Sequence, residues 1–336
     1  MNKYTKKTKV IIISSLILLM LSIILSMTVG SFRMSIIDIF TLSFLQDDTT
    51  KTIFLDIRLP RILNILFIGA ALACSGNILQ SLLQNNLAEP GIIGISAGAG
   101  LGAIIMFLIP NFSTYILLTP VAFIFAMSTT FLIFAIAKAL TNKYTNFLSS
   151  NKIILAGIAI NALLSAANGL LLIVAGKANT QIIFWLTGGV SGKGWFEFFF
   201  SAPFIIIGII IAFLIRKELG ILSTGIEIAQ SLGVSTKRIQ IVSILTASLL
   251  AAAAVSVAGI IVFVGLIIPN IAKLILQGDN KNVIVVSTIL GSIFMVLSDL
   301  LARTLIAPAE IPVGIITSFI GAPVFIWLII RNSNIV

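Results

Sequence analysis

The sequence predicts an all-α membrane protein, a single polytopic membrane domain over residues 1–336 with about ten transmembrane helices. Of the 336 residues, 59% are hydrophobic and only 10% are charged, whereas soluble domains carry about 25% charged residues. Apolar stretches of about 20 residues, the length at which a helix crosses a bilayer, recur along the whole chain. The polar stretches between them are too short for a separate soluble domain.

Ten stretches meet this length and composition. They lie near 10–29, 62–82, 92–109, 115–137, 153–175, 196–215, 239–257, 259–276, 283–301 and 312–330. The eighth stretch is interrupted by Gly259, Gly265 and Pro269. Such breaks survive in a membrane only where neighbouring helices or a cavity satisfy the freed backbone groups.

The N-terminal segment carries four lysines ahead of the first apolar stretch: Lys3, Lys6, Lys7 and Lys9. A signal peptide has a similar pattern, but here the apolar run is long and no small-residue cleavage site follows it. We therefore expect a retained first span at about 10–29. With a cytoplasmic N-terminus, the inner segments hold 14 of the 21 basic residues, as the positive-inside rule requires. Both termini are then cytoplasmic, and the protein is expected in the cell membrane.

The sequence lacks the residues that chemistry inside a membrane would need. It contains no histidine and one cysteine, Cys74, and its acidic residues lie near span ends or in loops. We therefore expect no enzyme activity, no catalytic residues, no cofactor and no metal site. The glycine-rich stretches at 94–102 and 188–194 fit neither a dinucleotide loop nor a P-loop. A proton-coupled carrier usually needs an ionisable residue near mid-span, so a carrier that works without ATP is the weaker alternative.

One inner polar segment, residues 216–240, is long enough for two short helices. Gly233 suits the position after a helix, where φ is positive, and Ser235 suits the N-cap of the next helix. The segment is too polar to insert into the bilayer. We therefore expect these short helices on the cytoplasmic surface, where a partner protein could press on them.

Arginines at the outer ends of spans run against the charge trend of the rest of the chain. Arg58 and Arg61 precede the second span, and Arg303 ends the ninth. One interpretation is interfacial snorkelling or an ion pair with Asp56 or Asp299. The other is that outward-facing guanidiniums bind carboxylates of a docking protein. The spacing alone does not separate the two.

Short motifs spread over most of the chain occur together in a recognisable order. They are Arg58-Leu-Pro-Arg61, Asn86-Leu-Ala-Glu-Pro-Gly91, Gly94-Ile-Ser-Ala-Gly98, Leu155-Ala-Gly157, Trp185-Leu-Thr-Gly-Gly189, Ser231-Leu-Gly-Val234, Phe263-Val-Gly-Leu-Ile-Ile-Pro269, Asp299-Leu-Leu-Ala-Arg303 and Glu310-Ile-Pro-Val-Gly314. With this set, from about Arg58 to Arg331, the chain resembles the FecCD family of permeases. These are the membrane subunits of ATP-binding cassette (ABC) importers for ferric siderophores, haem and cobalamin.

The resemblance implies the architecture of a type II ABC importer permease, in which two identical or homologous ten-helix subunits form a dimer. Cytoplasmic ABC ATPase subunits hydrolyse ATP, and an extracellular or lipoprotein substrate-binding protein delivers the cargo. The roles that the resemblance carries over are binding-protein docking by Arg58, Arg61 and Arg303, ATPase coupling by Glu227, Ala229, Gly233 and Arg238, and a cytoplasmic gate at Ser150 and Asn151. Spans five and ten, with a short segment near 179–185, are expected to line the path at the dimer axis.

The expected cargo is a ferric siderophore, with haem or cobalamin as alternatives within the same family. Family members usually have Pro-His at the inner end of the eighth span, whereas this chain has Pro269-Asn270. Asparagine keeps hydrogen-bonding capacity but cannot become charged near neutral pH.

Overall fold

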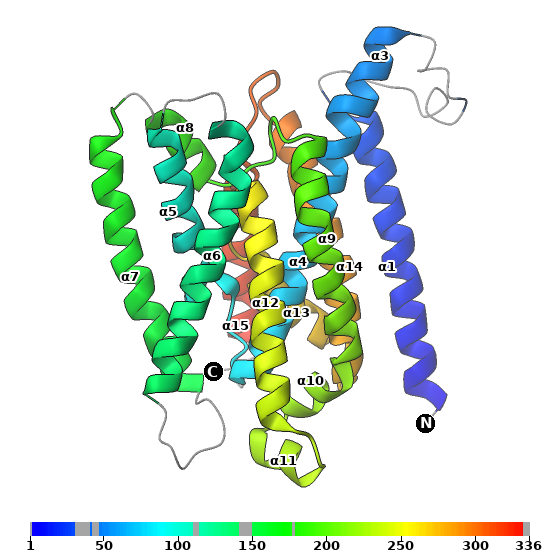
Figure 1. Cartoon of the computed structure of the whole chain (residues 1–336). Helices are drawn as coiled ribbons and strands as arrows, with labels where there is room; N and C mark the ends of the chain where they lie inside the picture. The colour runs from blue at the N-terminus through cyan, green and yellow to red at the C-terminus, as the bar shows by residue number, and fades with distance from the viewer. Residues whose placement is uncertain are drawn as a thin grey trace.

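The computed structural model describes residues 2–30, 41, 47–109, 114–140, 150–176 and 179–331. In this part of the chain the regular elements are helices, and Figure 1 shows most of them running side by side through one bundle. Eight described helices are long and apolar enough to cross a membrane. The predicted all-α membrane fold is therefore confirmed.

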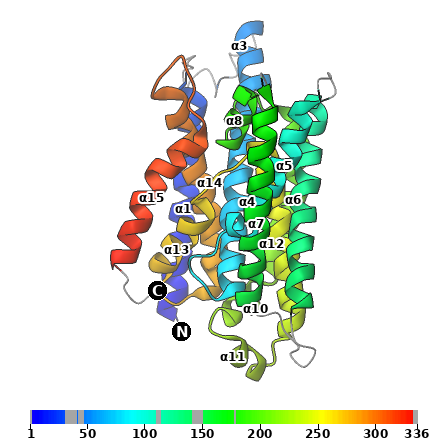
Figure 2. The same ribbon diagram turned by 90° about the vertical axis from the view of Figure 1, so that its left-hand side faces the viewer.

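The eight long helices follow the predicted spans in order. They are α1 (Asn2–Thr28), α4 (Leu59–Leu83), α6 (Thr114–Ala139), α7 (Ser150–Val174), α9 (Trp195–Leu214), α12 (Thr236–Ala258), α14 (Asn280–Thr304) and α15 (Val313–Arg331). The short helix α3 (Asp48–Thr52) and the π-helical turn η2 (Ile53–Arg58) lead directly into α4. In Figure 2 the N-terminus and the end of α15 lie at one end of the bundle, together with α10 (Arg216–Leu222) and α11 (Ile226–Ser231). We call this the inner end and the opposite one the outer end.

The predicted third and eighth spans are shorter than expected. Helices α5 (Ile95–Leu108) and α13 (Val264–Leu276) have 14 and 13 residues, about 21 Å or less at 1.5 Å per residue. The hydrocarbon core is about 30 Å thick, so each helix covers only part of it. The break before α13 occupies residues 259–263, whereas Gly265 and Pro269 lie inside the helix. Such irregular backbone is tolerated at membrane depth where protein surrounds it.

Helix α4 lies at the centre of the bundle, against α12, α13 and α14. In the span that contains it, 83% of the most apolar window is buried, compared with 17% for α1 and for α7. Glycines bring the central backbones together, since a Cβ atom added to Gly69 would lie 2.4 Å from the carbonyl oxygen of Gly291. A Cβ atom added to Gly76 would lie 2.0 Å from the carbonyl oxygen of Gly265. Small residues thus replace bulky side chains where the helices must approach closely.

Candidate functional site

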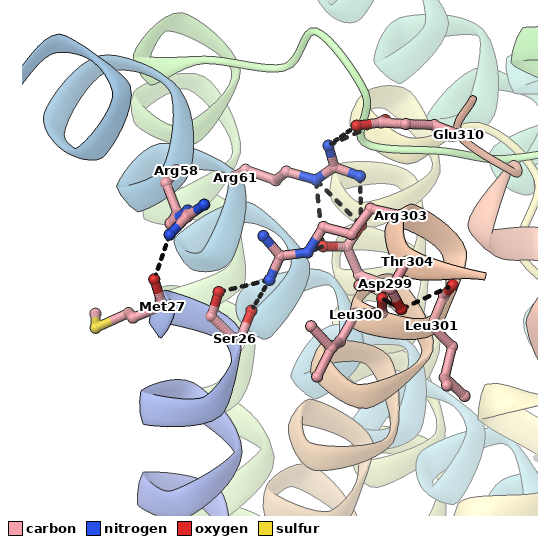
Figure 3. Close-up of polar contacts among 10 residues, drawn as sticks. All are labelled: Ser26, Met27, Arg58, Arg61, Asp299, Leu300, Leu301, Arg303, Thr304 and Glu310. Carbon is pink, nitrogen blue, oxygen red and sulfur yellow. Dashed lines mark hydrogen bonds and ion pairs between the residues drawn. The ribbon is translucent and has the colours of Figure 1, made fainter. Parts of the chain in front are cut away.

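The outer end of the bundle carries a cluster of charged residues, which we call the outer arginine cluster: Arg58, Arg61, Asp299, Arg303 and Glu310. Arg58 and Arg61 come from the junction of η2 and α4, and Glu310 from the loop before α15. Asp299 and Arg303 are one helical turn apart near the end of α14, so they share a face. Figure 3 shows these side chains meeting beside the end of α1.

Arg61 joins the two carboxylates of the cluster. Its Nη2 lies 2.9 Å from Asp299 Oδ1 and its Nη1 lies 2.9 Å from Glu310 Oε1. The Asp299 side chain is fully buried, whereas that of Glu310 is 34% exposed. Burial alone raises the pKa of Glu310, but hydrogen bonds from Arg61 and its positive charge outweigh this and hold the pKa below its usual value. The ion pair with Asp299, one of the alternatives left open by the sequence, is therefore present.

Arg58 and Arg303 are directed toward α1 rather than toward open solvent. Arg58 Nη1 donates to the carbonyl oxygen of Met27. Arg303 Nη2 donates to both the carbonyl oxygen and the hydroxyl of Ser26, each at 2.6 Å. Both arginines are buried, at 5% and 7% exposure. The outer arginine cluster thus holds three guanidiniums against two carboxylates, and the C-terminal end of α1 supplies further negative potential.

A cavity of about 570 Å³ opens beside α15. Its lining residues are Leu186, Thr187, Ile260, Val262, Gly314, Ile315, Ser318, Phe319, Ala322 and Pro323. None of these ten side chains is ionisable. The lining comes from α8 (Asn179–Leu186), from the break before α13 and from α15. Of the predicted path elements, span ten lines this cavity, and Leu186 and Thr187 directly follow the segment near 179–185, whereas none of the ten lining residues comes from α7, the predicted span five.

Three segments that line or adjoin this cavity touch one another through their backbones. Gly188 has φ +75°, and a Cβ atom there would lie 2.3 Å from the carbonyl oxygen of Ile260. A Cβ atom on Gly314 would lie 2.1 Å from the carbonyl oxygen of Thr187. The amide of Gly314 also donates to the carbonyl oxygen of Gly188 at 3.0 Å. Motifs far apart in the sequence thus require glycine because their backbones touch.

The N-terminus of α13 begins inside the protein next to a carboxylate. Phe263 is the N-cap residue of α13 and has φ +71°, and its amide donates to Glu89 Oε2 at 3.3 Å. Val262, the preceding residue, lines the cavity. The positive end of this short helix is therefore already faced by the carboxyl group of Glu89.

The inner end of the bundle carries the predicted coupling residues. Gly233 has φ +79° and Ser235 occupies the N-cap position of α12, as predicted. Glu227, Gly233 and Arg238 are exposed, but Ala229 is fully buried and packs into the bundle. The exposed side of α11 and its C-cap residue instead presents two apolar side chains that sequence reasoning missed, Ile228 and Leu232, at 50% and 64% exposure. Their spacing of four residues in a polar segment was the available signal.

The predicted gate residues begin α7, where Asn151 is exposed and Ser150 is partly buried. Asn270 lies elsewhere, in a buried polar network at the middle of α13. Its amide donates to the carbonyl oxygens of Asn86 and Leu266, at 2.9 and 2.8 Å. Asn270 therefore has a structural role as a donor that needs no charge.

The structure is a bundle of membrane-crossing helices with a cavity free of ionisable side chains beside α15 and short helices at one end, an arrangement that suits a transport permease. The FecCD transport family model matches residues 18–331, so the chain belongs to this family. It is 35% identical to the "Fe(3+)-citrate import system permease protein YfmE" of Bacillus subtilis, covering 98% of both chains. It is 34% identical to the "Hemin transport system permease protein HmuU" of Yersinia pestis, covering 95% of both. A solved metal-chelate type ABC transporter in an inward-facing conformation aligns with a TM-score of 0.84 and 27% identity, over 96% of this chain and 99% of that one.

Proposed function

We propose that this permease imports a ferric siderophore across the cell membrane, as one subunit of an ABC importer whose ATPase is a separate chain. The observation that carries the proposal is membership of the FecCD family over residues 18–331, among relatives named for iron chelates and haem. Haem and cobalamin are the alternative cargoes. The inner end of the bundle faces the cytoplasm in this proposal, so both termini and α11 are cytoplasmic.

The cavity beside α15 would form one half of the transport path. A second permease subunit would complete the path on the other side of the dimer axis. An opening of about 570 Å³ is in the range of small-molecule sites. Its lining has hydroxyl and backbone groups but no fixed charge. A path needs weak binding so that the cargo can leave, and such a lining satisfies this requirement.

The outer arginine cluster is the proposed docking site for the binding protein. Its three guanidiniums supply charged N–H donors that a carboxylate of the binding protein would accept. A charge-assisted hydrogen bond to a guanidinium is about twice as strong as a neutral one, which favours this recognition. At the inner end, Ile228 and Leu232 would enter an apolar groove of the ATPase, with Glu227 and Arg238 at its rim.

The docking role can be tested by measuring binding-protein affinity for the permease–ATPase complex in nanodiscs. Arg58→Gln, Arg61→Gln and Arg303→Gln are each expected to weaken docking by about tenfold or more, since about 1.4 kcal/mol corresponds to a factor of ten. Lys51→Gln is the matched control, because Lys51 is an exposed cation on the same outer face. Charge reversal to Glu is avoided, since it would place a carboxylate at position 61 beside Asp299. Unchanged affinity for all three folded Gln variants would refute the assignment.

The cargo can be tested by uptake into cells lacking this gene. Labelled hydroxamate and catecholate ferric siderophores, haem and cobalamin are supplied in parallel. We expect loss of one ferric siderophore, restored by the intact gene but not in a strain whose partner ATPase is inactive. Restoration without ATPase activity would instead support a secondary carrier, and loss of haem or cobalamin uptake would change the cargo.

A further inference from the structure

Helix α1 is held to the bundle differently from the central spans. Only 17% of its most apolar window is buried, against 72% for α14, the helix on which it packs. The buried positions of its inward face are small hydroxyl residues: Thr8, Ser15, Ser22 and Ser26. These small residues let α1 approach α14 closely, and the partly buried Ile11 and Ile12 pack beside them. Because so little of α1 is buried, the polar contacts at its two ends form a large share of its attachment.

At the outer end, α1 is held by two members of the outer arginine cluster. Arg58 and Arg303 donate to the carbonyl oxygens of Met27 and Ser26 (Figure 3). These carbonyls belong to the last turn, whose acceptors have no partner within the helix. Gly30 lies against the same two guanidiniums, since a Cβ atom there would be 3.0 Å from Arg58 Nη2. The arginines thus cap the C-terminal end of α1.

At the inner end, α1 is held by the connection between α13 and α14. Lys7 Nζ donates to Gln277 Oε1 and the Thr8 hydroxyl donates to Asp279 Oδ2, both at 2.8 Å. The start of α14 in turn contacts the C-cap of α10, where Asn280 Nδ2 lies 3.4 Å from the hydroxyl of Ser223. Helix α1 therefore runs from the outer arginine cluster to the α13–α14 connection, which adjoins α10.

We propose that Arg58 and Arg303 are positioning residues for α1, and that a carboxylate of the docking protein competes with α1 for their N–H groups. The second half of this proposal rests on the docking role described above. A carboxylate is a stronger acceptor for a guanidinium than a neutral carbonyl is. Docking therefore weakens the outer attachment of α1, and the helix shifts at that end while its inner end stays on the α13–α14 connection.

The experiment measures the position of the outer end of α1 by double electron–electron resonance. Nitroxides are placed at Leu25→Cys on α1 and Phe199→Cys on α9, which are 45% and 66% exposed. The native Cys74 is fully buried and does not take the label. Labelled subunits are diluted with unlabelled ones so that distances within one subunit dominate. A second pair, Ile124→Cys and Phe199→Cys, excludes α1 and serves as the control.

Without binding protein, Arg58→Gln combined with Arg303→Gln is expected to broaden the Leu25–Phe199 distances. Arg61→Gln, whose contacts are with carboxylates rather than α1, is expected to leave them narrow. An unchanged distribution in the double variant would overturn the positioning role.

With the native arginines, adding loaded binding protein is expected to shift the Leu25–Phe199 distance by about 1–2 Å or more, as helix shifts typically do. The control pair should stay unchanged. If the binding protein docks and the distance stays the same, the competition is refuted while docking stands. If it does not bind at all, the docking role fails and takes the competition with it, and the positioning role is judged by the arginine variants alone.

Discussion

Replacing Asp299 by Asn should destabilise the protein far more than the same change at Glu310. The Asp299 carboxylate is fully buried and contacts both Arg61 and Arg303, at 2.9 and 3.7 Å. Its loss leaves two guanidiniums without their buried counter-charge, and breaking a buried pair in this way costs about 3–5 kcal/mol. Glu310 is 34% exposed, and such pairs contribute about 0–1 kcal/mol.

The assay is thermal unfolding of the purified permease in detergent, followed by a thiol-reactive dye at the buried Cys74. For a chain of 336 residues the conversion is about 1.4 °C per kcal/mol, so Asp299→Asn should lower Tm by about 4–7 °C. The control Glu310→Gln should lower it by about 1.4 °C at most. Equal shifts in the two variants would refute the argument that burial, rather than the number of ion pairs, decides the magnitude.

Three further predictions concern the cavity and the loop before α15. Gly188→Ala should lower Tm, because it adds backbone strain of about 1–3 kcal/mol and a clash with the carbonyl oxygen of Ile260. Gly189→Ala makes only ordinary van der Waals contacts, so its free energy of unfolding should stay within about 1 kcal/mol of native; equal losses in the two variants would contradict this. Because the pKa of Glu310 is lowered in the folded protein, its ionised form stabilises the fold at pH values above the ordinary glutamate pKa of about 4.3. The Tm difference between native protein and Glu310→Gln should therefore vanish as the pH falls through the pKa of the folded state; a constant difference would contradict this. Ala322→Trp should reduce uptake at least about tenfold with normal assembly, while Ile210→Trp on the exposed face of α9 should not.

The positions of the long helices could be predicted because length and hydropathy are local properties. Segments at 92–109 and 259–276 are apolar enough to read as full spans, but helical structure in each is shorter. The reason is non-local. The break before α13 is stabilised by Glu89, whose carboxyl group accepts a hydrogen bond from the amide of Phe263. Because Glu89 lies 174 residues away, the local sequence around Phe263 gives no indication of this contact.

The outer arginine cluster was predicted only in part, because its arrangement also depends on contacts between distant parts of the chain. The sequence places Arg58, Arg61 and Arg303 near one surface, and the structure brings them together. The direction in which the side chains of Arg58 and Arg303 point depends on where α1 ends, and hydropathy does not specify that position. The buried side of Ala229 likewise depends on how α11 packs, and a six-residue helix has too few turns to show an apolar face in its sequence.

The carboxylate of Glu89 has a consequence for the chemistry of the cargo. The N-terminus of a half-helix deep in a transporter is a common binding site for anions, and here the carboxyl group of Glu89 already occupies it. Because the cavity lining has no charged side chain, the electrostatic potential along it would discriminate little between complexes of different net charge. With the docking role proposed above, a different binding protein would then supply a different cargo to the same permease without any change in its membrane domain.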